Sequence, residues 1–229
     1  SNGQLGTGSK TTSEYSPVDV QQLAGIRQIS AGYRHTCAVL DSGAAKCWGV
    51  NSNFQLGDGT AVEKLVPTTP TGMGSGVKKI SSGRAHTCAV MANGAARCWG
   101  GNAYGQVGDN TTTDAKSPVT VYNLSSGVKD IDAGHGSGYE HTCALTNSGG
   151  VKCWGYNANG ELGVQTGTQS KVPVDVTDLT SGVAELSVGY QHNCVRMSDG
   201  GTKCWGGNGF GQLGLGFSGS KRLPMDVVR

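Results

Sequence analysis

The sequence predicts an all-β fold, a β-propeller of four-stranded blades, and three observations support this prediction. Glycine supplies 39 of the 229 residues, more than double its average share of about 7%. A 15-residue pattern occurs four times, beginning at His35, His86, His141 and His192. No segment shows sustained helical periodicity. Units of this length, built from short apolar runs and glycine turns, are typical of propeller blades rather than helical solenoids.

One unit contains four segments with strand character, which we expect at 77–82, 87–91, 95–99 and around 118–122. The first three are short apolar runs bounded by glycine. The fourth carries a proline, which cannot donate a hydrogen bond to a strand ladder. We therefore expect it at the outer edge of the blade, where proline also opposes edge-to-edge pairing. The same proline recurs in every unit, at Pro67, Pro118, Pro173 and Pro224.

The repeats organise the chain as one propeller-type domain, 1–229. A partial leading repeat occupies 1–31 and carries an extra copy of the glutamine motif at Gln4. An insertion of four residues within 134–140 is the only length change among the complete units. Because the chain begins in mid-repeat, we expect missing repeats; the alternatives are a compact four-bladed ring or an open array completed by another copy. The successive repeats are expected at 32–82, 83–133, 134–188 and 189–229.

Recurring short motifs identify a family. Each unit contains His-Thr or His-Asn, then Trp-Gly, then a triplet such as Gln55-Leu56-Gly57. This pattern resembles the regulator of chromosome condensation repeat over essentially the whole chain. The resemblance implies a β-propeller, commonly with seven blades, so the four hairpins here are expected to belong to a larger ring. It also implies that the tryptophans pack between blades. One branch of the family senses ultraviolet light through clustered tryptophans, but one per blade does not predict that activity.

Eight cysteines form four pairs, each ten residues apart, around a three-residue loop that ends in glycine, such as Asp41-Ser42-Gly43. A type I turn followed by a left-handed glycine produces this loop and sets the hairpin register. The two cysteines then face each other with Cα atoms ~4.5 to 5.5 Å apart, within reach of a disulfide. We predict one disulfide per blade and therefore an oxidising compartment, extracellular or on a bacterial cell surface. The predicted pairs are Cys37–Cys47, Cys88–Cys98, Cys143–Cys153 and Cys194–Cys204.

A metal site is the competing interpretation, because His35, Cys37 and Cys47 would share one strand face. No fourth ligand recurs beside these three, so we expect neither metal nor cofactor. The repeated histidine is expected to be a hydrogen-bonding strut between strands, because a buried polar side chain must be satisfied.

Several function classes are disfavoured. The net charge is +2, with basic residues spread thinly, so we expect no nucleic-acid partner. No apolar run approaches the ~18 residues of a membrane span, so membrane insertion is not expected. Nucleophile-elbow, Walker and His-Glu-x-x-His motifs are missing from the sequence, so we expect no enzyme.

Function is expected where the repeats differ, since folding accounts for the shared positions. The residues before each repeated histidine vary and include tyrosine and arginine, which dominate binding energetics. The insertion around His135 enlarges this loop face. An alternative is that the tyrosine rings only pack on the adjoining loop. The candidate partner-binding residues are Tyr33, Arg34, Arg84, His135, Tyr139, Glu140, Tyr190 and Gln191.

The sequence therefore predicts a non-enzymatic extracellular propeller whose loop face binds a protein. One alternative is a glycan-binding propeller with a site in each blade. Another is a structural subunit of a surface assembly or fibre, formed by self-association of incomplete rings. The glycan alternative would use equivalent amide side chains, such as Asn102, Gln106, Asn208 and Gln212.

Overall fold

The computed structural model describes residues 2–10, 14–136 and 138–228, and these form sixteen strands in four antiparallel sheets. The first sheet holds β1 (Ile26–Ala31), β2 (His35–Leu40), β3 (Ala45–Gly49) and β4 (Lys64–Thr68). The second holds β5 (Val77–Ser82), β6 (His86–Met91), β7 (Ala96–Gly100) and β8 (Ala115–Thr120). The third holds β9 (Val128–Ala133), β10 (His141–Thr146), β11 (Val151–Tyr156) and β12 (Gln169–Asp175). The fourth holds β13 (Val183–Val188), β14 (His192–Met197), β15 (Thr202–Gly206) and β16 (Lys221–Asp226).

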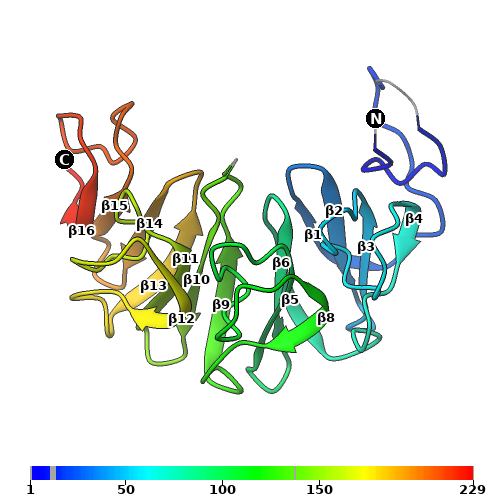
Figure 1. The fold of residues 1–229 in the computed structure, drawn as a ribbon, viewed down its shortest axis with the longest axis horizontal. Coiled ribbons are helices and arrows are strands. Elements are labelled where there is room, and N and C mark those ends of the chain that lie inside the picture. Colours follow the sequence, from blue (N-terminus) through cyan, green and yellow to red (C-terminus); the bar gives the residue numbers. More distant parts are fainter. Residues whose placement is uncertain (1, 11–13, 137, 229) are drawn as a thin grey trace.

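Each sheet is a meander of four consecutive strands, and the sheets follow one another along an arc (Figure 1). The first strand of each sheet contacts the first strand of the next, so β1, β5, β9 and β13 lie along the inside of the arc. The prediction of an all-β chain with four propeller-type blades is confirmed. Among the described residues, no helix has the length and apolar character needed to cross a membrane.

The predicted strands of the second blade agree with β5 to β8 within three residues. The fourth strand of every sheet is an edge strand, as predicted, and each contains the recurring proline. A strand paired on one side only loses little when a proline removes one N–H donor. The predicted repeat limits do not coincide with the limits of the sheets. For example, β5 is the last segment of the sequence unit 32–82 but the first strand of the second sheet.

The predicted hairpin chemistry is confirmed. The Gly43 N–H donates to the Leu40 carbonyl over 2.8 Å, and Gly43 has a φ of +79°, a conformation that a Cβ atom disfavours. The turn places Cys37 directly opposite Cys47, and the two are bonded, with Cα atoms 4.1 Å apart, slightly closer than expected. The other three pairs form in the same way. All eight sulfur atoms are therefore bonded in pairs, so the cysteine thiolates that the competing metal interpretation requires are not available.

Neighbouring sheets are joined through the tryptophans, as the family resemblance implies. Trp99 is fully buried, and its Nε1 donates to the Gln55 carbonyl of the preceding repeat over 2.9 Å. Gly57 lies against the Trp99 ring, where a Cβ would approach within 2.7 Å, so this position requires glycine. The leading segment serves the first sheet in the same way, because the Gln4 carbonyl accepts from Trp48 Nε1 over 2.9 Å.

The repeated histidines are hydrogen-bonding struts, and they connect adjacent sheets rather than strands of one sheet. His35 Nε2 lies 2.9 Å from Thr87 Oγ1. That hydroxyl donates to the Gln55 carbonyl over 2.7 Å, so it accepts from the histidine and fixes the proton on Nε2. The arrangement recurs at the next two junctions, as His86–Thr142 (2.9 Å) and His141–Asn193 (2.8 Å).

Candidate interaction face

The varying residues before each repeated histidine lie in the loops between the first and second strands of the sheets. At the first of these loops Tyr33 is 54% exposed. The Arg34 guanidinium lies 5.2 Å from the centroid of the Tyr33 ring, and that of Arg84, from the next sheet, lies 5.7 Å from the same centroid. Two cations on one aromatic ring form a polar and apolar contact surface across the first junction.

A second group of aromatic rings lies on the second, third and fourth sheets. Tyr139 packs against Tyr156 with ring centroids 4.8 Å apart, and against Tyr190 at 6.3 Å. Tyr104 lies edge-to-face on Tyr156 at 5.2 Å. Edge-to-face pairs of this kind hold the rings in defined positions. The alternative that the rings pack on adjoining loops is thus partly realised, yet Tyr190 is still 46% exposed.

We call these two groups together the tyrosine–arginine strip. The varying loops predicted five of its members, but Tyr104 and Tyr156 were missed. Both lie where the chain enters the loop after Trp-Gly, Tyr156 as the last residue of β11 and Tyr104 in the loop after β7. The repeats also differ there: the residue after that glycine is Val50, Gly101, Tyr156 or Gly207. The same comparison of repeats, applied to this second loop, would have found them. The strip comprises Tyr33, Arg34, Arg84, Tyr104, Tyr139, Tyr156 and Tyr190.

Glu140 requires a correction, because it is not a surface contact. Its side chain is 4% exposed and lies between the second and third sheets. One carboxylate oxygen is 3.4 Å from Arg84 Nη1, and the other is 3.1 Å from His86 Nδ1 and 3.3 Å from Gln106 Nε2. The second oxygen also accepts from the Ala85 N–H over 3.4 Å. A buried carboxylate needs such partners, so Glu140 joins the sheets and positions Arg84.

The charge states at the junctions follow from burial. Burial raises the pKa of Glu140, but the hydrogen bonds from His86 and Gln106 and the charge of Arg84 outweigh it, so this pKa is lowered overall. Burial, followed by the nearby His86 and His135, lowers the pKa of His35 to about 3. Burial lowers the pKa of His141 to about 4, although its hydrogen bond to Asn193 acts in the opposite direction. His35 and His141 are therefore neutral at pH 7.

The insertion lies beside the strip. His135 is exposed and Gln191 is half-buried. A Cβ at Gly136 would approach the Tyr190 carbonyl oxygen within 2.6 Å and its ring within 3.2 Å, so the insertion rests against the loop of the fourth sheet. Ser137 falls outside the described residues. The predicted enlargement of this face thus adjoins Tyr190, while its role in binding stays a prediction.

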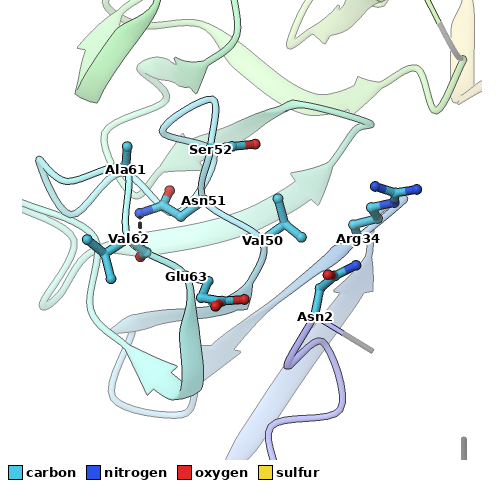
Figure 2. A pocket seen from close by; sticks show the side chains of 8 residues that line it. All are labelled: Asn2, Arg34, Val50, Asn51, Ser52, Ala61, Val62 and Glu63. Atoms are coloured by element: carbon cyan, nitrogen blue, oxygen red, sulfur yellow. Dashed lines mark hydrogen bonds between the residues drawn. The ribbon is translucent and has the colours of Figure 1, made fainter. Parts of the chain in front are cut away.

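Two pockets adjoin the Tyr33 end of the strip. The smaller, about 150 Å³, is lined by Tyr33, Arg34, Arg84 and the loop 50–55. The larger, about 440 Å³, shares Arg34 with it and extends to Glu63. Figure 2 shows Arg34 at one side of the larger pocket, above Asn2 and beside Val50, while Asn51 turns toward the Val62 carbonyl, to which it donates over 3.1 Å. Arg34 therefore stands where the two pockets meet.

The amide side chains of the glycan alternative are used within the fold. Asn102 is fully buried, and its Nδ2 donates to the Thr113 carbonyl while its Oδ1 accepts from the Val107 N–H. Gln106 and Asn208 are buried as well, and Gln212 Oε1 accepts from the Phe210 N–H. Asn102, Gln106 and Asn208 are thus held inside the fold, whereas Gln212 is half-buried.

The fold and its sheet junctions define a propeller-type repeat array stapled by one disulfide in each sheet. Two sequence profiles described as the Regulator of chromosome condensation (RCC1) repeat match the chain. The chain therefore belongs to the RCC1 repeat family. One profile matches residues 26–55, 77–106, 128–161 and 183–212, and the other matches residues 1–39, 43–90 and 148–196.

Among individual relatives, the chain is 31% identical to the ultraviolet-B receptor UVR8 of Arabidopsis thaliana, over 98% of this chain and 51% of the receptor. It is 32% identical to the human probable E3 ubiquitin-protein ligase HERC4, over 92% of this chain and 20% of that protein. The chain thus spans half of the first relative and a fifth of the second.

Solved structures show the same fold. Human WBSCR16 matches with a TM-score of 0.83 at 24% identity, over 100% of this chain and 60% of that one. Prp20p from Saccharomyces cerevisiae matches with a TM-score of 0.81 at 20% identity, over 93% of this chain and 53% of that one. Identities this low establish the architecture alone.

Proposed function

We propose that this chain is a non-enzymatic extracellular interaction module that binds a protein partner through the tyrosine–arginine strip. The observation that carries the proposal is the strip itself, in which rings and guanidinium groups from four consecutive sheets are held in position by one another. Tyrosine and arginine are the side chains enriched among energetic hot spots of protein interfaces. Edge-to-face packing reduces the side-chain entropy lost on binding.

Two further observations support the proposal. Four disulfides favour an oxidising compartment, which is the reason to place the module outside the cytoplasm. Structures of the yeast relative are described as Prp20 bound to Kap60 and as Prp20p with binding properties toward Gsp1p and histones, so that propeller binds proteins. Binding of a protein by the present chain is our proposal, since it spans 53% of Prp20p.

The experiment is affinity capture with the oxidised chain, followed by measurement of the dissociation constant for the recovered protein. Tyr33→Ala and Tyr190→Ala remove the most exposed rings of the strip. Each is expected to weaken binding by about tenfold to thirtyfold, corresponding to about 1.4 to 2 kcal/mol. The matched control is Tyr122→Ala, because Tyr122 is 48% exposed but lies just after the edge strand β8, away from the strip.

Binding that is equally strong in both strip variants and in the control would overturn the proposal. Recovery of a glycan rather than a protein by the same immobilised chain would also overturn it.

A further inference from the structure

The junction between the second and third sheets contains a niche that holds a carboxylate. Four donors surround the Glu140 side chain there, namely Arg84 Nη1, the Ala85 N–H, His86 Nδ1 and Gln106 Nε2. All four belong to the second repeat, whereas the carboxylate comes from the third. Glu140 occupies the position immediately before the repeated histidine.

The first junction has the equivalent backbone N–H, imidazole and amide positions but no carboxylate. By the repeat, the residues equivalent to Ala85, His86 and Gln106 are Arg34, His35 and Gln55. The position equivalent to Glu140 is Ala85 itself, and its methyl group cannot accept a hydrogen bond. The first junction is therefore formed by the equivalent segments of the repeat, but it has no glutamate to fill the niche.

A pocket of about 150 Å³ lies at this junction. Its lining includes Arg34 and Gln55, the equivalents of Ala85 and Gln106, together with Arg84. Two buried nitrogen atoms of this junction, Arg84 Nε and His35 Nδ1, have no hydrogen-bond partner in the part of the chain that the structure describes, and the same nitrogen of His141 and His192 also has none there. His35 is 1% exposed, and its counterpart His86 uses the same nitrogen to bind Glu140. Buried polar atoms without partners are uncommon in folded proteins.

We propose that this pocket binds a carboxylate, the side chain of a glutamate or aspartate on the protein partner. The proposal deepens the proposed function and rests on it, because the pocket adjoins Tyr33 at one end of the strip. Guanidinium groups bind carboxylates with short, charge-assisted hydrogen bonds, and Arg34 is an exposed cation at the pocket wall. The Gln55 amide is placed to donate as Gln106 does to Glu140.

The tautomer of His35 determines how an acid in this niche could contact the imidazole ring. His35 Nε2 carries a proton that it donates to Thr87, so Nδ1 of the neutral ring presents a lone pair. An acid that reaches Nδ1 can form a hydrogen bond there only with a proton between the two atoms, at the position where Glu140 lies 3.1 Å from His86 Nδ1 in the next repeat. An acid that stops at the pocket mouth would contact only the guanidinium groups and the Gln55 amide.

The test uses the oxidised chain labelled with ¹⁵N and a one-carboxylate probe, the peptide Ac-Gly-Glu-Gly-amide. The neutral peptide Ac-Gly-Gln-Gly-amide and sodium glucuronate are titrated in parallel. Resonances of the Arg34 and Arg84 Nε–H groups and the Gln55 amide report on the pocket. The expected result is a saturable shift at these groups with the glutamate peptide, weaker with glucuronate and missing with the glutamine peptide.

Two kinds of variant define the site. Arg34→Gln is expected to weaken binding of the glutamate peptide by about tenfold. Ala85→Glu supplies the carboxylate from within, as in the next repeat, and is expected to abolish the peptide-induced shifts. Ala85→Gln has a similar size without the charge and is the second variant should the glutamate variant fail to fold. Arg196→Gln is the matched control, because Arg196 is an exposed arginine on the fourth sheet, paired with Glu185.

Three outcomes would overturn the inference: equal shifts with the neutral peptide, tighter binding of glucuronate than of the glutamate peptide, or unchanged binding in Arg34→Gln. A fourth measurement separates this inference from the proposed function. If Ala85→Glu binds the protein partner as the unmodified chain does, while Tyr33→Ala and Tyr190→Ala do not, the strip is the binding face and the carboxylate pocket is wrong.

Discussion

The first and second sheet junctions have the same backbone framework, yet one is closed and the other is open. At the second junction Glu140 links Arg84, His86 and Gln106 and is itself buried. At the first, alanine stands in place of the glutamate, His35 Nδ1 has no partner among the described residues, and a pocket adjoins Arg34. The residue immediately before the repeated histidine distinguishes the two junctions: Glu140 fills the second with a buried carboxylate, whereas Ala85 provides no acceptor at the first.

The largest expected effect is the pH dependence of stability. The pKa of His35 is lowered to about 3 and that of His141 to about 4, against 6.5 in the unfolded chain. The unfolded chain therefore takes up protons that the folded chain rejects. Stability is full above pH 6.5 and decreases as the pH falls toward these values. Between pH 6.5 and 4.5 we expect the free energy of unfolding to fall by about 4.5 kcal/mol.

Urea titrations across this pH range measure the decrease, and His35→Gln separates the junctions. Glutamine keeps an N–H donor for Thr87 but does not titrate, so the variant is expected to lose about half of the slope. The pKa of Glu140 lies below its usual value, so its contribution is lost only at lower pH. An unchanged slope in His35→Gln would contradict the assignment of a neutral, buried His35.

The next effect concerns the closed junction. Glu140→Ala leaves His86 and Arg84 without their shared carboxylate, and breaking a buried ion pair costs about 3 to 5 kcal/mol. We expect a loss of about 3 kcal/mol at pH 7, because Arg84 is 37% exposed and water screens its part of the network. The measurement is urea unfolding with the disulfides intact.

Glu185→Ala is the control for this prediction, since Glu185 is an exposed partner of Arg196 and its removal should leave stability nearly unchanged. Similar losses in the two variants would mean that Glu140 does not join the sheets as described.

The smallest effect is expected from closing the open junction. Ala85→Glu places a carboxylate among Arg34, Arg84 and the Gln55 amide, and charge-assisted hydrogen bonds of this kind contribute about 1 kcal/mol after desolvation. We expect the free energy of unfolding at pH 7 to rise by about that amount, with Ala85→Gln showing no increase. A clear decrease in Ala85→Glu would show that the two junctions are not equivalent.

The repeated features of the fold were predictable from the sequence because each depends on local chemistry. The Asp41-Ser42-Gly43 loop fixes the hairpin register, and the register brings Cys37 opposite Cys47. Pro118 follows the same reasoning, since a missing N–H is tolerated at an edge strand. The histidine strut between strands was predicted, but not that the two strands belong to adjacent sheets, because the bond from His35 to Thr87 joins residues 52 positions apart.

The site was less predictable because it depends on burial across sheets. Glu140 was placed on the surface from its position beside Tyr139, while the structure turns its side chain inward onto donors of the preceding repeat. Tyr156, the last residue of β11, packs on Tyr139 within the third sheet, and Tyr104 reaches Tyr156 only after the second and third sheets pack together. Sequence spacing within one repeat contains no information on such meetings.

The disulfide arrangement has a consequence for how the chain matures. Eight cysteines allow 105 pairings, yet every disulfide here joins two consecutive cysteines that are ten residues apart. Short loops close rapidly and at low entropic cost, so each bridge can form once its own hairpin has emerged, before later segments are available to compete. Oxidation can therefore follow synthesis in order, with little need for a catalyst to reshuffle wrong bonds.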